Sequence, residues 1–89
     1  MRFYTRKELV QIVGCDDGFL IRLEHEQIVR CDAPEAAAAE FSERMLERVR
    51  VARTLMQDLD VNLEGAAIIV RMREEIASLH HQLADLLRR

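Results

Sequence analysis

The chain has 89 residues, of which 33% are charged and 4% are aromatic, and its formal net charge is −3. A chain of this length forms one small domain, or a small domain with a helical extension, and it buries too little surface for high stability unless it associates. No apolar run approaches the ~20 residues that cross a bilayer, and the N-terminus lacks the apolar core of an export signal. We therefore expect a cytoplasmic, mainly α-helical protein without membrane contact.

The cysteines and histidines do not have the spacing of a metal site. Cys15 and Cys31 form no CxxC pair, and His80 and His81 are adjacent, so on a helix they project about 100° apart. We expect reduced thiols that act as small hydrophobic residues, with no metal and no cofactor. The chain also lacks a Gly-rich phosphate loop and a Ser/His/Asp arrangement, and for that reason we do not expect an enzyme.

The first third of the chain has the signals of two short helices joined by a tight turn. Thr5-Arg6-Lys7-Glu8 has the T-x-x-E form of a capping box, Gly14 is placed to end the first helix, and Asp16 can cap the second. The inner face of the second helix is expected to consist of Phe19, Leu20 and Leu23. A helix, a glycine-containing turn and a second helix of this length predict a helix-turn-helix.

A short β segment, or wing, is expected after the second helix. Residues 27–30 contain the β-branched pair Ile28 and Val29, which predicts one arm of a hairpin. Cys31-Asp32-Ala33-Pro34 predicts a turn. The alanine-rich residues 35–40 fit either a helix or a second wing strand. We therefore expect any wing to be short or imperfect.

A third helix is predicted from its cap at Ser42 to about Asp60. Its apolar stripe has steps of three and four and consists of Met45, Val49, Ala52, Met56 and Leu59. Four arginines lie mostly off this stripe and fit a solvated helix face: Arg44, Arg48, Arg50 and Arg53. A break follows, and Asn62 or Leu63 begins the last helix.

The last helix has the clearest pattern in the sequence, two interleaved series of apolar residues seven positions apart. These a and d positions are Ile69, Met72, Ile76, Leu79, Leu83 and Leu86. We expect them to form the seam of a dimeric coiled coil, because a helix of ~25 residues is ~38 Å long and its end lies beyond the reach of a 60-residue head. Packing of this stripe on the chain's own core is the alternative. Residues 1–60 then form the head and residues 61–89 the dimerisation helix of one folding unit.

The order of these parts resembles the MerR-type winged-helix family. Phe41-Ser42-Glu43-Arg44-Met45-Leu46-Glu47-Arg48-Val49-Arg50 looks like the family's third helix, and Leu55-Met56-Gln57-Asp58-Leu59-Asp60-Val61-Asn62-Leu63-Glu64-Gly65 like the loop into its fourth. Ala39-Glu40-Phe41 replaces the Arg-Tyr pair typical of the DNA binders, and no cysteine follows Cys31 as in the metal sensors. The chain is more similar to the CbpM-type chaperone-modulator branch.

This resemblance implies an antiparallel homodimer that binds the J-domain of a DnaJ-like (CbpA-type) co-chaperone. Such binding would inhibit stimulation of a DnaK-type chaperone. Residues 1–40 have five basic and eight acidic groups, and this excess suits a basic protein partner. The expected J-domain site is Asp16, Asp17, Ile21, Glu24 and Glu26, although each acid also fits a helix cap or a solvated charge.

The alternative function is that of a MerR-like DNA-binding transcriptional regulator. A recognition helix presents its N-terminal residues to base edges and its flanking basic residues to phosphates. Here the second helix begins with Asp16 and Asp17 and offers Arg22 as its one arginine. DNA therefore remains a possible but disfavoured partner.

Overall fold

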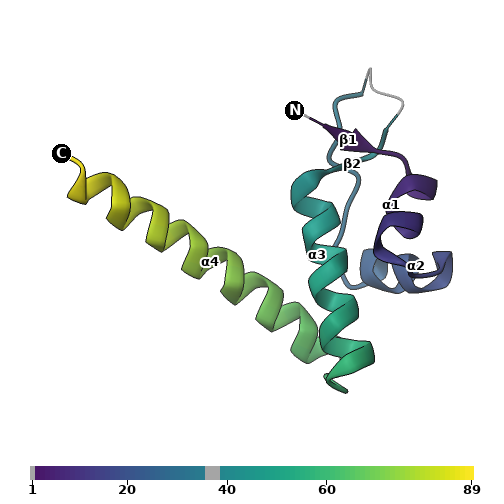
Figure 1. Cartoon of the computed structure of the whole chain (residues 1–89). Coiled ribbons are helices and arrows are strands. Elements are labelled where there is room, and N and C mark those ends of the chain that lie inside the picture. Colours follow the sequence, from purple (N-terminus) through teal and green to yellow (C-terminus); the bar gives the residue numbers. More distant parts are fainter. Residues whose placement is uncertain (1, 36–38) are drawn as a thin grey trace.

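A computed structural model of the chain describes residues 2–35 and 39–89. The described residues form four α-helices, α1 (Arg6–Val13), α2 (Asp17–His25), α3 (Glu43–Arg53) and α4 (Leu63–Leu87). Two short strands, β1 (Phe3–Tyr4) and β2 (Phe41–Ser42), pair antiparallel, and a π-helical turn, η1 (Thr54–Asp58), follows α3. Figure 1 shows that the elements from β1 to η1 form a head, from which α4 extends as an arm. The mainly α, helix-turn-helix architecture predicted from the sequence is confirmed.

The predicted helix caps are all present. The Glu8 backbone N–H donates to Thr5 Oγ1 (3.1 Å) while the Thr5 N–H donates to Glu8 Oε1 (2.9 Å), which completes the capping box of α1. Gly14 ends α1 in the left-handed conformation (φ 77°), and Asp16 Oδ1 accepts from the Phe19 N–H (2.8 Å) at the start of α2. These local bonds fix the turn and hence the angle between the two helices.

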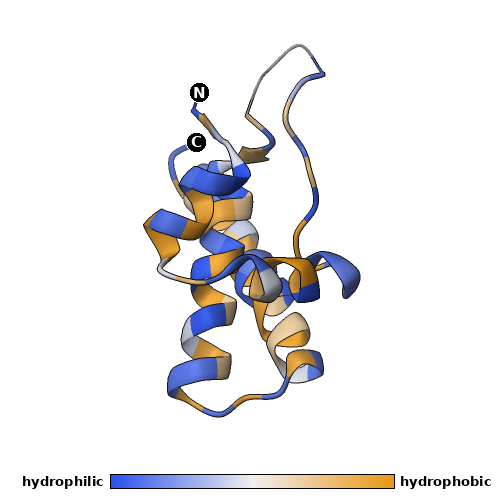
Figure 2. Ribbon diagram, turned by 90° about the vertical axis from the view of Figure 1, so that its right-hand side faces the viewer, coloured by the Kyte–Doolittle hydropathy of each residue, from blue (hydrophilic) through white to orange (hydrophobic). Residues whose placement is uncertain are grey.

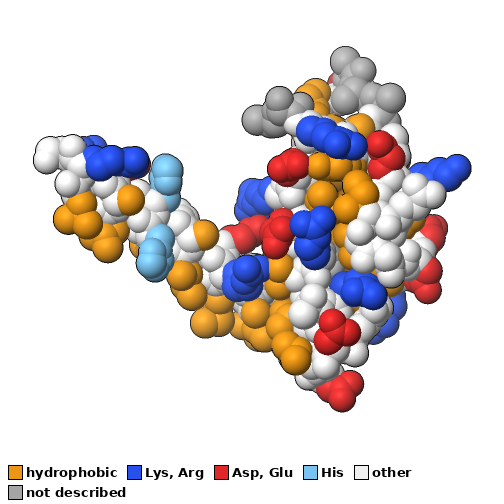
Figure 3. Space-filling view, in the orientation of Figure 1, with side chains coloured by type: hydrophobic (Ala, Val, Ile, Leu, Met, Phe, Trp, Pro, Cys, Tyr) orange, Lys and Arg blue, Asp and Glu red, His pale blue; other side chains and the backbone are white. Residues whose placement is uncertain are grey.

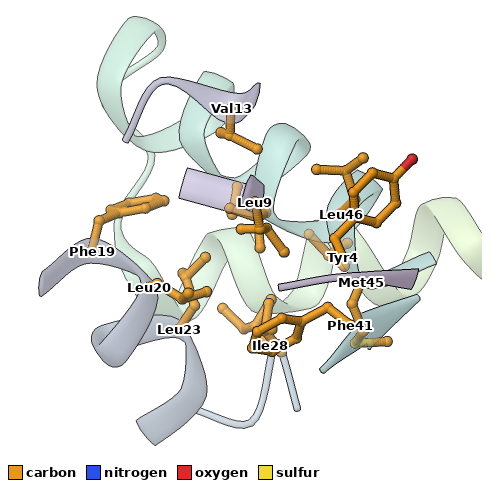
Figure 4. Close-up of a cluster of buried hydrophobic side chains, with 14 of the residues drawn as sticks. Tyr4, Leu9, Val13, Phe19, Leu20, Leu23, Ile28, Phe41, Met45 and Leu46 are labelled. Atoms are coloured by element: carbon orange, nitrogen blue, oxygen red, sulfur yellow. The ribbon is translucent and has the colours of Figure 1, made fainter. Parts of the chain in front are cut away.

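The core of the head lies where α1, α2 and α3 meet beneath the small sheet (Figure 4). The predicted inner face of α2 is confirmed, since Leu20 and Leu23 are fully buried and Phe19 nearly so. Figure 2 shows apolar and polar residues interleaved along the helices, as amphipathic helices require. The largest fully buried side chains are Phe41, Leu9, Leu20, Leu23, Met45, Val29 and Val49. Each contributes about 1.5–3 kcal/mol by leaving water.

The wing differs from the prediction. Residues 27–30 form no strand, because Gln27 adopts a left-handed conformation (φ 60°) and the N–H groups of Ile28 and Val29 donate to the Leu23 carbonyl at the end of α2. The N-terminal strand β1, which the sequence did not predict, pairs with β2 instead, with Tyr4 opposite Phe41. Residues 36–38 of the alanine-rich segment lie outside the described residues, so helix and strand both remain open there.

The third helix is shorter than predicted and its stripe turns away from the core at the end. Met45, Val49 and Ala52 are fully buried as expected, but Leu59 is 63% exposed. The π-helical turn explains this difference, because its wider hydrogen-bonded loop inserts an extra residue and rotates the following positions out of the 3.6-residue register. The prediction that Leu59 packs inward was therefore wrong.

The arm begins as predicted, with Asn62 as its cap: Asn62 Oδ1 accepts from the Gly65 N–H (2.7 Å). Ala66, Ala67 and Val70 are buried against the head, and α4 then leaves it, so residues 78–89 are all exposed. Among the described residues, no helix combines the length and the apolar character that crossing a membrane requires.

Candidate functional site

The predicted partner-binding residues all lie on or beside α2, the second helix of the helix-turn-helix. Ile21 lies in the middle of the helix and is 53% exposed, so its side chain is available to a partner. Asp16 and Glu26 lie at opposite ends of α2, as its N-cap and C-cap residues. The Asp16 carboxylate is occupied by capping, whereas Glu26 caps through its backbone only, and its residue is exposed.

Two of the predicted acids are brought together by an arginine from α1. Arg6 Nη1 lies 3.1 Å from Asp17 Oδ1, and Arg6 Nη2 lies 2.5 Å from Glu24 Oε1. The hydrogen bond from Arg6 to Glu24 is the main cause that raises the pKa of Arg6, so the guanidinium stays charged. The sequence did not predict this bridge, because Arg6 is 18 positions from Glu24.

The bridge changes the electrostatics of the α2 surface in two ways. It neutralises part of the acidic face, because two carboxylates share one guanidinium. It also occupies the basic side chain nearest to the N-terminus of α2, where a DNA-binding helix would need cations. Residues 5–26 have three basic and five acidic groups, for a net charge of −2. The surface remains acidic, with Ile21 as its exposed apolar centre.

The predicted dimer seam forms a continuous apolar face on α4. Met72, Ile76, Leu79, Leu83 and Leu86 are 54–60% exposed, whereas Ile69 is half-buried. Each helical residue advances by about 100°, so Met72 and Leu79 project about 160–180° away from the buried Val70. Figure 3 shows the resulting row of hydrophobic side chains along the edge of the arm that faces away from the head. The alternative that this stripe packs on the chain's own core is therefore wrong.

The junction of head and arm contains a cluster of ion pairs. Its arginines come from α3, where the sequence predicted a solvated helix face. Arg48 on α3 is buried (8% exposed) and donates to Glu74 on α4 through Nε (2.9 Å) and Nη2 (2.6 Å). Its third contact, from Nη1, reaches the Ile28 carbonyl just after α2 (3.0 Å). Arg44 approaches the same carboxylate, with Nη2 3.0 Å from Glu74 Oε1. Arg48 is thus buried in a structural ion pair with Glu74, and its prediction as part of a solvated helix face was wrong.

The cluster holds Glu74 firmly in its ionised form. The hydrogen bonds from Arg48, followed by those from Arg44, lower the pKa of Glu74 from its ordinary value of 4.5 to about 2. Because Arg48 also binds the Ile28 carbonyl, one guanidinium connects the end of α2, α3 and the arm. This contact fixes the direction in which α4 leaves the head.

The two cysteines differ in burial. Cys15 is partly buried, and burial raises the pKa of its thiol, whereas Cys31 is exposed. Both are free thiols. Within residues 2–35 and 39–89, no group of three or more His, Cys, Asp or Glu side chains has a geometry that could hold a metal ion.

The comparison with known protein families agrees with this architecture. The model of the MerR HTH family of regulatory proteins matches residues 4–88, which is nearly the whole chain. No curated protein and no solved structure gives a significant match. A family of regulatory proteins accords with the expectation of a binding role rather than a catalytic one. With its helix-turn-helix head and long C-terminal helix, this chain belongs to the MerR HTH family of regulatory proteins.

Proposed function

We propose that the chain is a homodimeric, CbpM-type chaperone modulator. It binds the J-domain of a DnaJ-like (CbpA-type) co-chaperone and inhibits the stimulation of a DnaK-type chaperone. The observation that carries this proposal is the surface of α2, where exposed Ile21 is surrounded by acidic groups and the nearest arginine, Arg6, is already bound to Asp17 and Glu24. Such a surface suits a basic protein better than a nucleic acid.

The proposed site combines an apolar contact with complementary charge. Ile21 is the apolar anchor, since burying its side chain in a partner's pocket is worth about 1.5–3 kcal/mol. Glu26 is exposed and its carboxylate is free to attract a basic patch, whereas Asp17 and Glu24 must share their charge with Arg6. Complementary charge raises the association rate and specificity more than the affinity.

The second part of the proposal is the homodimer. Five seam residues expose more than half of their surface in the single chain, and a row of apolar residues this long is rarely left in water. A second copy of the same stripe covers it by knobs-into-holes packing. Because the seam faces away from the head, the two α2 surfaces remain accessible in the dimer.

The proposal is tested by the ATPase rate of a DnaK-type chaperone stimulated by its DnaJ-like co-chaperone, measured with increasing amounts of the chain. We expect inhibition by the wild type and at least tenfold weaker inhibition by Ile21→Ser combined with Glu26→Lys, since loss of the Ile21 contact alone removes about 1.5 kcal/mol or more and the charge reversal opposes a basic partner. Ile21 and Glu26 are both exposed and outside the buried core, so we expect the variant to remain folded, which circular dichroism checks. Asp58→Lys, an equal charge change on η1, is the control. Equal inhibition by all three proteins would contradict the assigned surface.

A MerR-like DNA-binding transcriptional regulator is the second candidate, and the family assignment favours it. Its contacts would come from exposed basic residues of the head, Lys7 and Arg22 on the first two helices and Arg50 on α3. Binding to promoter DNA that falls steeply with salt and is lost in Arg22→Gln would support this reading. Absence of ATPase inhibition together with such binding would replace the modulator proposal.

A further inference from the structure

A polar pocket lies at the junction of head and arm, away from the exposed face of α2. Its volume is about 370 Å³, and it is lined by residues of four segments. They are Glu24 of α2, Gln27, Val29 and Arg30 of the loop that follows, Arg48 of α3 and Arg71 of α4. Three of these six residues are arginines, in a chain whose net charge is −3.

Of the four charged residues that line this pocket, two form ion pairs and two do not. Arg48 is bound to Glu74, and Glu24 is bound to Arg6, so neither has a full charge to offer. Arg30 and Arg71 are exposed, and neither forms an ion pair with any residue that the structure describes. Two arginines without an ion-pair partner among the described residues therefore line one pocket, one from the head and one from the arm.

We infer that this pocket binds a phosphate group, carried by free phosphate or by a small phosphorylated metabolite. Guanidinium groups match phosphate oxygens with paired, charge-assisted hydrogen bonds, and a dianion placed between Arg30 and Arg71 compensates both charges. Arg30 belongs to the head and Arg71 to the arm, so the bound anion would tie the two together beside the Arg48–Glu74 pair. The inference stands independently of the J-domain proposal.

The arrangement of these arginines favours a single bound phosphate group over a nucleic-acid backbone. The arginines lie at one junction rather than along a strip, and the carboxylate of Glu24 in α2 lies beside them. A net negative chain attracts anions only where local charges are arranged for it. Binding would therefore depend on these two arginines and not on the overall charge.

The test is thermal unfolding of the full chain in inorganic phosphate, compared with potassium chloride at equal ionic strength. We expect phosphate at ten times its dissociation constant to raise Tm by about 5–10 °C. Arg30→Gln and Arg71→Gln should each weaken the affinity about tenfold or more, because each removes charge-assisted hydrogen bonds. Arg89→Gln, which removes an exposed positive charge at the end of the arm and outside the pocket, should leave the shift unchanged.

Adenosine monophosphate and a short DNA duplex identify the source of the phosphate. A larger shift with the nucleotide indicates a phosphorylated metabolite, and equal shifts indicate free phosphate. The inference is overturned by the absence of any phosphate-specific shift, by equal shifts in wild type and both variants, or by tight duplex binding that the variants lose. If a variant fails to fold by circular dichroism, NMR of the wild type decides: phosphate must perturb the Nε–H signals of Arg30 and Arg71 before those of other arginines.

Discussion

At the scale of single residues, Arg48 determines how the head holds the arm. Its three contacts satisfy a guanidinium that is almost completely removed from water, and two of them end on the Glu74 carboxylate. An isolated buried charge lowers the stability of a protein, so Arg48 stabilises the fold only together with its partner Glu74. Sequence patterns did not reveal it, because Arg48 lies off the apolar stripe of α3 and its partner is 26 positions away.

Removing the carboxylate should destabilise the protein strongly. Glu74→Gln leaves the buried Arg48 without its counter-charge, and we expect the free energy of unfolding to fall by about 2–4 kcal/mol. Urea denaturation followed by circular dichroism measures the change. Glu75→Gln removes an exposed carboxylate one residue further along α4 and should cost less than about 0.5 kcal/mol. Equal losses in the two variants would refute the role given to the cluster.

The same pair predicts how stability depends on pH. The folded-state pKa of Glu74 is lowered to about 2, so its contribution is fully present above the unfolded value of 4.5 and is lost as the pH falls from 4.5 towards 2. We expect the wild type to lose about 1–3 kcal/mol from this group over that window, after allowance for solvent screening. In Glu74→Gln this component is absent, so the difference between the two proteins must shrink on acidification. A constant difference from pH 6 to pH 2.5 would contradict this assignment.

At the scale of elements, local signals predicted the caps and the helices but not the features that depend on distant partners. Thr5, Gly14, Asp16, Ser42 and Asn62 cap helices as their sequence context indicates, since capping needs only neighbouring backbone groups. Strand β1 forms because β2 is available 38 positions later, and no periodicity in two residues signals it. The sequence did not predict the π-helical turn either, because the spacing of its apolar residues resembles that of an α-helix.

The two glycines of the helix-turn-helix should respond to alanine in opposite directions. Gly14 has φ 77°, a conformation that costs alanine about 1–2 kcal/mol even though no atom lies within 4 Å of the added methyl group. Gly18 lies within α2, where the nearest atom to the added methyl group is Asp16 Oδ1 at an ordinary 3.5 Å, so alanine should stabilise by about 0.5–1 kcal/mol. Thermal unfolding of Gly14→Ala and Gly18→Ala tests both signs, and a stabilised Gly14→Ala would contradict the turn geometry.

At the scale of the whole molecule, the chain presents two separate surfaces, an acidic one on α2 and an apolar one along α4. The apolar stripe of α4 was predictable, because its heptad spacing can be counted in the sequence, and the coiled coil that it is expected to form stays a prediction. The sequence left open whether the stripe would meet its own head, and the direction of α4 depends on the Arg48–Glu74 contact, which joins distant positions. The sequence placed the proposed binding residues on or beside α2, where the structure also has them, but it did not predict the Arg6 bridge that neutralises part of their charge, and their role in binding stays a prediction.

Charges placed in the seam should separate the dimer without destroying the head. Ile76→Glu with Leu79→Glu puts like charges into the centre of the seam, and we expect a monomer by sedimentation at concentrations where the wild type is a dimer. The helicity of the arm should fall while the head, whose core lies elsewhere, keeps its structure. Ser78→Glu with Ala84→Glu adds the same charge at exposed positions outside the seam and should leave the dimer intact. A dimer that survives both pairs of changes would rule out this seam.

Binding of a J-domain to the acidic face of α2 is best measured by calorimetric titration of the chain with the isolated J-domain of a DnaJ-like protein from the same organism. The proposed function predicts saturable binding at micromolar concentration or tighter, which corresponds to about 8 kcal/mol. It also predicts one J-domain per protomer and at least tenfold weaker binding by Ile21→Ser combined with Glu26→Lys. No heat and no complex by gel filtration would contradict the account and make DNA binding the leading function.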